Sequence, residues 1–502
     1  MERKKGVILS YILMVFEVLS TLLLTPFVLS VLGQAEYGVY KLSASITAYL
    51  LLLDLGVGTA IIRYISKFRA NQDIKSERDF FGVAIIYYGA IGLISLIGGY
   101  ALAGSFSTVF STGLCAEEIE LGKKLLLLTV ANAAVTLATA VYANVLLAHE
   151  KFALSKGSSI LQIILRMILT VVVLKLGMGS VGVVTVNLLT TILCRGFFAA
   201  YVVCVLKLRP NFRGIRFSFI KEILVYSTWV LIQMVATQIN ASMDQILLGS
   251  LVSGSATIIA VYSVGTQIVQ YFRSIGSSFN GVLMPGVVRL VEQHADGERI
   301  CGEMVRIGRF MFMVLGLIWS GFLVLGPQFI ALWAGDVNAD AYYVALLLMS
   351  VYLVIMTESI GIQMLWAKNE HKEQSILKLG IVLLNIILTV VLIRWKPLIG
   401  ATIGTVIALV AGDILVMNVV FSKKLKISLR RYYSGLFKGL LPGVLITAVL
   451  GFAVNLLPIP GWGGLIFKAG AMALSYAVTV WKIGLNEYEK NLLASLLKMK
   501  RR

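Results

Sequence analysis

The sequence predicts an all-α integral membrane protein with about fourteen transmembrane helices. Of its 502 residues, 58% are hydrophobic and only 14% are charged, and the mean hydropathy is +0.89. Soluble domains carry about 25% charged residues, so a chain this apolar cannot fold as a water-soluble globule. The apolar residues also gather into runs of about 20 residues or more, the length that one helix needs to cross the hydrocarbon core of a bilayer.

Each helix is predicted from one such apolar run. The first run follows a basic start and is too long for the core of a signal peptide, and it contains Glu17, so we expect it to be retained as a helix. The later runs are separated by short polar connections. The predicted spans are 7–32, 38–64, 80–103, 121–148, 156–176, 181–206, 223–250, 257–288, 304–326, 341–366, 376–394, 399–421, 439–457 and 464–484.

The connections between the spans alternate between basic ones and ones with few basic residues. Both ends of the chain belong to the basic set, as do the connections around Lys67, Lys151 and Lys423. The positive-inside rule therefore predicts that both termini are cytoplasmic, which an even number of helices requires. The net charge of +19 would indicate nucleic-acid binding in a soluble protein. Here it is explained by topology and by contact with anionic lipid headgroups, so no nucleic-acid partner is expected.

The longest basic connection within the first twelve spans, Lys207 to Lys221, divides them into two lobes of six helices each. A short repeat crosses this division, and it pairs Val39-Tyr40, Ile46 and Tyr49 with Val261-Tyr262, Ile268 and Tyr271. Lobes with an even number of helices lie parallel in the membrane. The predicted domains are an N-lobe (1–206), a basic cytoplasmic linker (207–222), a C-lobe (223–421), and a basic loop with two added helices and a cytoplasmic tail (422–502).

Two spans carry polar residues at steps of three and four, which places each row on one face of a helix. The rows are Gln233, Thr237, Asn240 and Asp244, and Tyr262, Thr266, Gln270, Arg273, Ser277 and Asn280. Lipid cannot hydrogen-bond to such residues, so each row must face other helices or a wet cavity. Any single polar residue in these rows is explained by hydrogen bonding to a neighbouring helix. A continuous row that includes an ionisable residue favours the lining of a cavity.

Several motifs in the first lobe resemble the opening of the oligosaccharide flippases. These form the polysaccharide transport family of the multidrug/oligosaccharidyl-lipid/polysaccharide exporter superfamily. The motifs are Leu24-Thr25-Pro26-Phe27 through Leu32-Gly33, Glu36-Tyr37-Gly38-Val39-Tyr40, and Leu53-Asp54-Leu55-Gly56-Val57-Gly58 with Arg63-Tyr64. Asp244-Gln245, with Gly249 four residues further on, looks like the start of that family's second lobe. The resemblance covers the two lobes and not the added helices.

The resemblance implies a V-shaped transporter working by alternating access. It would flip an oligosaccharide linked to a polyprenyl diphosphate from the inner to the outer leaflet, for cell-surface polysaccharide biosynthesis. It also implies a bacterial cell (inner) membrane as the location. The expected partners are this lipid-linked glycan, the surrounding membrane lipids and, further, enzymes of glycan synthesis. The glycan itself, the coupling ion and the oligomeric state do not follow from the resemblance.

A diphosphate head requires cationic, hydrogen-bonding side chains, and arginine suits it because its planar fork stays charged. Three arginines lie well inside predicted spans and share polar faces with neutral residues. The candidate substrate-binding residues are Arg166 with Gln162, Arg195 with Asn187, and Arg273 with Gln270, together with Asn240. An ion pair that serves only structure is the alternative for each arginine.

Acidic residues inside predicted spans are candidates for ion coupling or gating. A carboxyl group in a membrane interior holds its proton more readily unless it is paired with a cation. The candidates are Asp54, Asp244 and Glu17, with neutralisation of the arginines as the alternative. For Glu358 and Asp413 a structural role is the favoured interpretation.

Two other functions stay open. A multidrug or cation antiporter of the same superfamily would need a cavity dominated by acids, whereas arginines are equally prominent in this chain. A membrane glycosyltransferase or polymerase would need a long outer loop, whereas the longest predicted outer connections, 104–120 and 327–340, are short. No catalytic residue, cofactor or metal site is predicted. The four cysteines have no metal-binding or disulfide spacing, and no phosphate-binding loop of the ATPase type is present.

Overall fold

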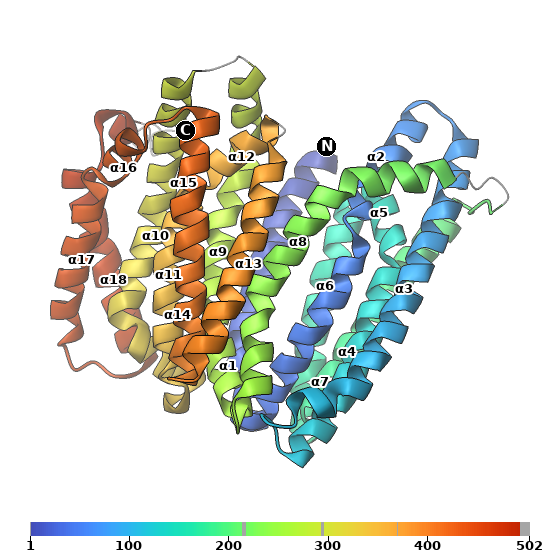
Figure 1. The fold of residues 1–502 in the computed structure, drawn as a ribbon, viewed down its shortest axis with the longest axis horizontal. Helices are drawn as coiled ribbons and strands as arrows, with labels where there is room; N and C mark the ends of the chain where they lie inside the picture. Colours follow the sequence, from blue (N-terminus) through green and yellow to red (C-terminus); the bar gives the residue numbers. More distant parts are fainter. Residues whose placement is uncertain (1, 213–216, 293–295, 369, 492–502) are drawn as a thin grey trace. The chain divides into compact units, whose positions relative to one another are not determined.

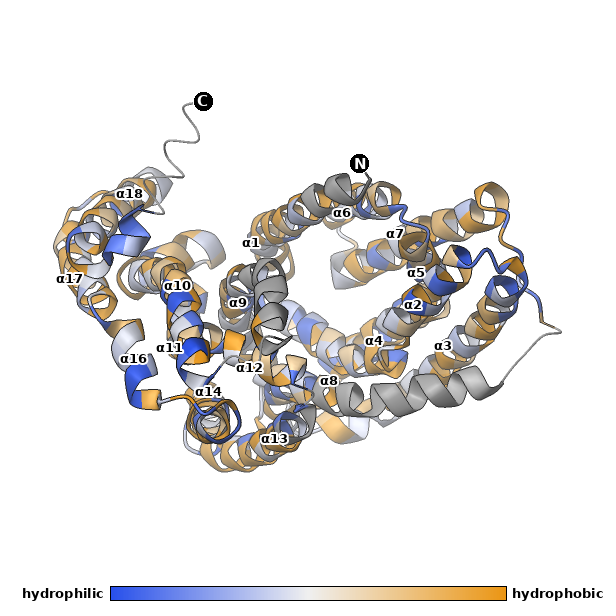
Figure 2. Cartoon of the chain, turned by 90° about the horizontal axis from the view of Figure 1, so that it is seen from above, coloured by the Kyte–Doolittle hydropathy of each residue, from blue (hydrophilic) through white to orange (hydrophobic). Residues whose placement is uncertain are grey.

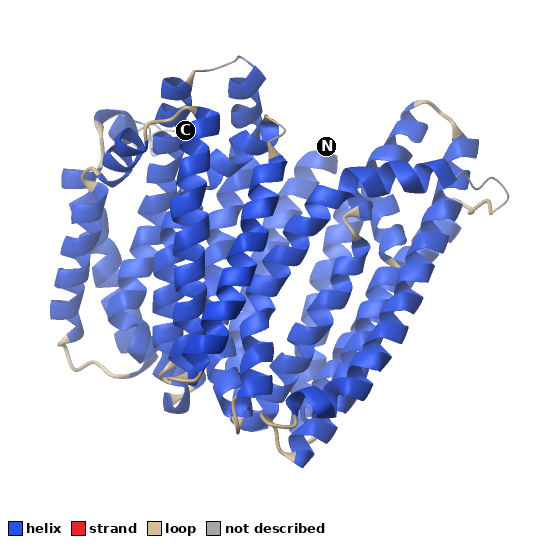
Figure 3. Ribbon diagram, in the orientation of Figure 1, coloured by secondary structure: helices blue, strands red, loops and turns tan. Residues whose placement is uncertain are grey.

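The computed structural model describes residues 2–212, 217–292, 296–368 and 370–491. Figure 3 shows helices joined by loops, and no strand occurs in these ranges. The chain divides into two compact units, Met1–Ala260 and Val261–Arg502. The division falls within one helix, and the helix before it belongs to the first unit. The predicted lobe boundary at 207–222 rests on charge and topology and stays a prediction.

The first unit is built from long helices with breaks at particular residues (Figure 1). Gly33 has φ 74° and ψ 173°, so α1 changes direction there without ending. Leu55 and Gly56 have φ of 53° and 71°, which separates α2 from the helical turn before it. The helices are α1 (Glu2–Leu50), η1 (Leu51–Asp54), α2 (Val57–Ala70), α3 (Ile74–Phe110), α4 (Ala116–Ala138), α5 (Ala140–Ala148), α6 (Phe152–Lys175), α7 (Gly179–Ala200), η2 (Tyr201–Val205) and α8 (Phe217–Leu251).

The second unit continues this pattern. Its helices α11 and α12 are inclined by 43° to each other at a break next to Glu358, and η4 and η5 are π-helical. The helices are α9 (Ser255–Glu292), which begins in the first unit, α10 (Gly297–Ala334), η3 (Asp336–Asn338), α11 (Ala341–Thr357), α12 (Ser359–Ala367), α13 (His371–Ile393), α14 (Pro397–Leu409), η4 (Val410–Val416), α15 (Met417–Val420), η5 (Phe421–Leu425), α16 (Leu429–Phe437), α17 (Leu440–Asn455), α18 (Gly461–Thr479) and η6 (Val480–Gly484).

The helices have the length and apolarity of membrane spans. In the part of the chain that the structure describes, ten helices qualify, and α11 with α12 makes an eleventh if the bent pair is one span. Every predicted span overlaps one of the observed helices. Figure 2 shows hydrophobic residues along most of them, and on α3 the side chains of Leu93, Ile97 and Tyr100 are exposed. The all-α membrane fold is confirmed, and the total of about fourteen spans stays a prediction.

The two added helices, α17 and α18, pack against each other and against α10. Buried cations fix both ends of this contact. At one end Lys468 donates hydrogen bonds to Asn455 Oδ1 at 3.1 Å and to Gln328 Oε1 at 3.2 Å. At the other end Arg309 Nε lies 2.6 Å from Glu489 Oε1, and both residues are less than 5% exposed. The added pair is thus an integral part of the second unit.

Arg309 also binds the backbone at the points where neighbouring helices begin or end. Its guanidinium group donates to the carbonyl oxygens of Gly435, Lys438 and Gly484 at 2.9, 2.8 and 2.6 Å. These carbonyls belong to α16, to the turn before α17 and to the end of η6. Arg309 therefore ties α10 to the start of the added pair, to its end and, through Glu489, to the segment that follows.

We predict that Glu489→Leu destabilises the protein by about 3–5 kcal/mol, because it leaves the Arg309 charge buried without its carboxylate partner. The matched control is Glu487→Leu, since the Glu487 side chain is 88% exposed and its ion pair lies on the surface. The control is expected to stay within about 0.5 kcal/mol of the wild type. Denaturant unfolding in detergent measures both, and equal values for the two variants would contradict the anchoring role of Arg309.

Candidate functional site

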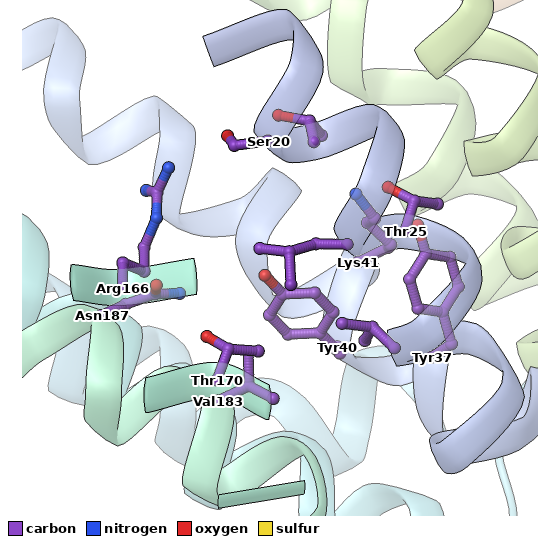
Figure 4. Close-up of a pocket in the computed structure, with 12 residues that line it drawn as sticks. Ser20, Thr25, Tyr37, Tyr40, Lys41, Arg166, Thr170, Val183 and Asn187 are labelled. Atoms are coloured by element: carbon purple, nitrogen blue, oxygen red, sulfur yellow. The ribbon is translucent and has the colours of Figure 1, made fainter. Parts of the chain in front are cut away.

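A polar pocket of about 190 Å³ lies inside the first unit, between α1, α6 and α7. Figure 4 shows Arg166 and Asn187 on one side of it and Lys41 with two tyrosines on the other. The twelve described residues that line the pocket include no aspartate or glutamate. They are Ser20, Thr21, Leu24, Thr25, Val28, Tyr37, Tyr40, Lys41, Arg166, Thr170, Val183 and Asn187.

The change of direction at Gly33 brings two parts of α1 to this pocket. Residues 20–28 line it from before the glycine, and residues 37–41 line it from after the glycine. Glu36 then fixes the second part, because its Oε1 accepts a hydrogen bond of 2.6 Å from the backbone N–H of Ser180. Ser180 lies in the first turn of α7, where a negative charge is favoured by the helix dipole. Glu36 thereby positions the residues that follow it against α7.

Lys41 is held by the two tyrosines that precede it on α1. Its Nζ lies 5.2 Å from the centre of the Tyr37 ring and 5.9 Å from the centre of the Tyr40 ring. A cation within about 6 Å of an aromatic face is attracted to the ring. Tyr37 is only 1% exposed and forms a fixed wall. The ammonium group is therefore stabilised in the pocket by the faces of two aromatic rings.

The backbone of α1 is packed closely beside the pocket. A Cβ atom on Gly38 would lie 1.8 Å from the carbonyl oxygen of Ala256, in the first turn of α9. Gly113, just after α3, is equally close to the carbonyl oxygen of Gly249, and its own carbonyl accepts a hydrogen bond of 2.9 Å from Ser255 N. Glycine is required at Gly38 because only a hydrogen atom fits between the two backbones.

The structure brings together part of the predicted substrate-binding set. Arg166 of α6 and Asn187 of α7 both line the pocket. Gln162, one turn before Arg166, donates from Nε2 to Thr191 Oγ1 at 3.4 Å and so joins α6 to α7. Arg195 does not belong to the lining of this pocket; it is half-buried, with its guanidinium carbon 5.9 Å from the centre of the Phe198 ring.

The remaining predicted residues lie elsewhere in the chain. Arg273 is in the second unit, with its guanidinium carbon 4.5 Å from the centre of the Tyr352 ring. Gln270 is exposed on α9, and Asn240 is half-buried on α8. The row members Gln233 and Asn280 have side chains outside the described part of the chain. A role for Arg195, Arg273, Gln270 and Asn240 in substrate binding stays a prediction.

The three acids predicted for ion coupling or gating have different surroundings. Asp54 accepts a hydrogen bond of 2.5 Å from Tyr88 Oη at the break before α2. Asp244 is only 2% exposed, on α8 where that helix packs against α1. Glu17 is exposed on α1, one turn before the pocket residues Ser20 and Thr21. None of the three lines the pocket, and their coupling roles stay predictions.

Lys41 is a pocket residue that the sequence pattern did not predict. The available signal was a lysine inside an apolar span, 38–64, flanked by the aromatic motif that carries the family resemblance. Two cations of different helices, Lys41 and Arg166, thus share a pocket that also holds hydroxyl groups and the amide of Asn187. Such a set of donors can bind an anion, since charge-assisted hydrogen bonds are stronger than neutral ones.

Solved structures with the same fold are membrane transporters. The lipid II flippase MurJ, in an inward closed conformation, has a TM-score of 0.73 at 16% identity, over 94% of this chain and 97% of that one. An inward-facing multidrug resistance transporter of the MATE family has a TM-score of 0.67 at 14% identity, over 81% and 95%. A transporter from Pyrococcus furiosus, whose reversed pocket polarity suggested a different function for it, has a TM-score of 0.59 at 18% identity, over 84% and 97%.

The chain is thus a multi-pass membrane protein with the fold of these transporters. Residues 4–291, more than half of the chain, match the family described as "Polysaccharide biosynthesis protein". The chain belongs to this family, and the resemblance seen in its opening motifs is confirmed. No curated protein sequence gives a significant match.

We predict that Gly38→Ala disturbs the pocket and destabilises the protein by about 1–3 kcal/mol, because the added methyl group overlaps a backbone oxygen that has no room to move. Gly89→Ala on α3 is the matched control. A Cβ atom there meets nothing within 4 Å, so alanine is expected to be neutral or up to about 1 kcal/mol stabilising. Unfolding temperatures of the purified variants measure the difference. A Gly38→Ala variant as stable as the wild type would contradict the close packing of α1.

Proposed function

We propose that the protein is a flippase that moves an oligosaccharide linked to a polyprenyl diphosphate from the inner to the outer leaflet. The observation that carries this proposal is that Lys41 and Arg166 line the same pocket, and that the described lining of this pocket has no carboxylate. A diphosphate is the anionic part of such a cargo. Arginine can bind phosphate oxygens with two parallel hydrogen bonds, and lysine contributes a compact charge.

The size of the pocket limits what it binds. Its volume of about 190 Å³ leaves room for phosphate oxygens with some water. We therefore assign the pocket to the diphosphate head. The sugar chain needs the larger space that alternating access opens, as the lobes change between inward-facing and outward-facing states.

An apolar groove in the second unit fits the polyprenyl tail. Its volume is about 380 Å³, and it lies between α9, α10 and α18, with one further residue from α11. Phe272, Leu317, Leu325, Leu465 and Met472 are among its aliphatic and aromatic lining. A polyprenyl chain gains free energy from such a surface by close packing, as helices do in lipid. The added helix α18 thus gains a function as one wall of the groove.

The pocket charges favour this cargo over the alternatives. A cation antiporter needs acidic groups to hold its substrate, whereas the charged lining residues of the pocket are Lys41 and Arg166. For the P. furiosus transporter too, a different function was inferred from the polarity of its pocket. An enzyme that builds glycosidic bonds would need positioned catalytic groups, and the cationic pocket supplies only binding groups. We therefore propose transport without chemical change of the cargo.

The protein would lie in the cell (inner) membrane of a bacterium. The basic connections support an orientation in which both of its termini are in the cytoplasm. The sugar head would then enter from the side where glycan is assembled. Enzymes of glycan synthesis on that side are natural partners, because they supply the lipid-linked substrate.

We predict that Lys41→Ala and Arg166→Ala each lower the flipping rate at limiting substrate by about tenfold to a hundredfold. Loss of one charged hydrogen bond costs about 1.5–3 kcal/mol, and about 1.4 kcal/mol corresponds to tenfold. The measurement is the transfer of a fluorescent polyprenyl-diphosphate sugar across the bilayer of proteoliposomes. Lys124→Ala is the control: it removes the same charge from an α4 side chain that is 61% exposed and paired with Glu120. It is expected to flip at the wild-type rate.

Charge-conserving variants sharpen this experiment. Lys41→Arg and Arg166→Lys are expected to keep more activity than the alanine variants, because the anion still meets a cation. Wild-type rates in both alanine variants would refute the diphosphate site. Uptake of a cationic drug by the wild type, with no movement of the lipid-linked sugar, would instead support the antiporter.

A further inference from the structure

A second polar cluster lies in the second unit, away from the pocket and the groove. It joins three elements: Glu358 at the break between α11 and α12, Asn418 on α15 and Tyr433 on α16. Glu358 is 1% exposed and Asn418 is 5% exposed. The break is the place where the two helices are inclined by 43°. A carboxyl group is thus buried at a point where the direction of the chain changes.

One oxygen of this carboxyl group is well satisfied. Glu358 Oε1 accepts a hydrogen bond of 3.0 Å from Asn418 Nδ2 and another from Tyr433 Oη. The nitrogen of the Asn418 amide is identified by a further bond of 2.7 Å to the carbonyl oxygen of Ile414, one turn earlier. The neighbouring Tyr432 donates to the carbonyl oxygen of Thr357 at 3.0 Å. The two tyrosines of α16 therefore both bind the break.

The other two oxygens of the pair have no hydrogen-bond partner among the described residues. Glu358 Oε2 and Asn418 Oδ1 are both buried and both unpaired. An ionised carboxylate and an amide oxygen can only accept hydrogen bonds, so neither can satisfy the other. Buried polar atoms are nearly always paired, and each exception needs an explanation. A single hydrogen atom placed between Glu358 Oε2 and Asn418 Oδ1 would give both oxygens a hydrogen bond.

We propose that Glu358 is a proton-binding site, in which one proton on Oε2 is donated to Asn418 Oδ1. The acid and the amide then exchange two hydrogen bonds, Nδ2–H to Oε1 and Oε2–H to Oδ1, and both unpaired oxygens are satisfied. Oε1 and Nδ2 already meet at 3.0 Å, so only small rotations of two planar groups are needed. The proton comes from water and returns to water, and the neutral acid is the form that fits this buried site.

The surroundings favour a neutral acid. Asp413 on η4 is the acid nearby, and both of its oxygens accept from Lys378 Nζ at 2.6 Å, so this lysine is already engaged. On α10, Arg309 is bound to Glu489, and the buried thiol of Cys301 points to the carbonyl oxygen of Ser428. On α16 the facing groups are the phenols of Tyr432 and Tyr433. Among these described neighbours no unengaged cation is left to hold an ionised Glu358.

A proton fits these two oxygens better than a metal ion does. Hard cations such as Ca²⁺ and Mg²⁺ collect six or more oxygen ligands, whereas the cluster offers two unpaired oxygens. The described residues also contain no group of three His, Cys, Asp or Glu that could hold a metal. A proton needs only one donor oxygen and one acceptor.

Proton binding would act on the shape of the helix break. With the proton present, α12, α15 and α16 are joined by a complete set of hydrogen bonds. Without it, two acceptor oxygens face each other in a dry site, and the contact between the break and α15 weakens. Glu358 would therefore link protonation to the bend between α11 and α12. This role goes beyond the proposed flippase function, because it holds whatever the cargo is. It also replaces the purely structural role that the sequence favoured for Glu358.

Infrared difference spectroscopy of the full-length protein in lipid nanodiscs tests the site directly. The wild type is expected to show a carbonyl-stretch band of a protonated carboxylic acid that disappears as the pH is raised. Glu358→Gln should lose this band. Glu303→Gln, which changes a more accessible glutamate of α10 whose partner is Arg306 on the same helix, should keep it. A spectrum of Glu358→Gln identical to that of the wild type would overturn the proposal.

Thermal unfolding provides a second readout that does not involve transport, so its failure would leave the flippase proposal untouched. Glutamine supplies an N–H group at the place of the proton, so Glu358→Gln is expected to unfold at the wild-type temperature under acidic conditions, while Glu358→Ala unfolds earlier. A glutamine variant that fails to fold would show that Oε2 must accept, and would overturn the proposal. So would a sodium-dependent rise in the unfolding temperature that the wild type shows and Glu358→Gln lacks, because a bound cation would then explain the two oxygens.

Discussion

The structure depends on one constraint: the hydrocarbon of a bilayer offers no hydrogen bonds, so polar side chains inside the helices must be satisfied by the protein or by trapped water. Arg309 meets this constraint with a carboxylate and three carbonyl oxygens, and Lys378 meets it with Asp413. Lys468 meets it with neutral oxygens. Lys41 and Arg166 share a pocket whose described lining holds hydroxyl groups and an amide but no acid.

The polar sites occur where helices deviate from regular geometry. The pocket of the first unit is lined from both sides of the turn at Gly33, and Asp54 binds Tyr88 beside the break at Leu55 and Gly56. In the second unit, Glu358 lies at the bend between α11 and α12, close to the π-helical segment that contains Asp413. A break frees backbone groups and re-aims side chains, so polar residues gather there. The same breaks are the points at which a change of helix direction costs least.

Each unit contributes a different surface. The first has a small cationic pocket formed by α1, α6 and α7, and the second has a larger apolar groove to which the added helix α18 contributes. A lipid-linked sugar has the same two parts, an anionic head and an apolar tail. The buried contacts of Arg309 and Lys468 keep α17 and α18 attached to α10, and so maintain the wall of the groove. The contacts that stabilise the added helices thus also hold the groove together.

The sequence by itself determined the membrane class, the approximate helix positions and the family. These are local properties, because the length of an apolar run and the charge of its flanks depend only on residues that are consecutive in the chain. It also indicated Arg166 and Asn187 as polar residues inside apolar spans, and both line the pocket. Only the tertiary structure decided which of these residues meet. Lys41 joins Arg166 because Gly33 turns α1 back and Glu36 fixes it to α7, whereas Arg195 and Arg273 pack against rings elsewhere. The sequence likewise could not predict the unpaired oxygens of Glu358 and Asn418, because hydrogen-bond satisfaction depends on contacts between helices that are distant in sequence.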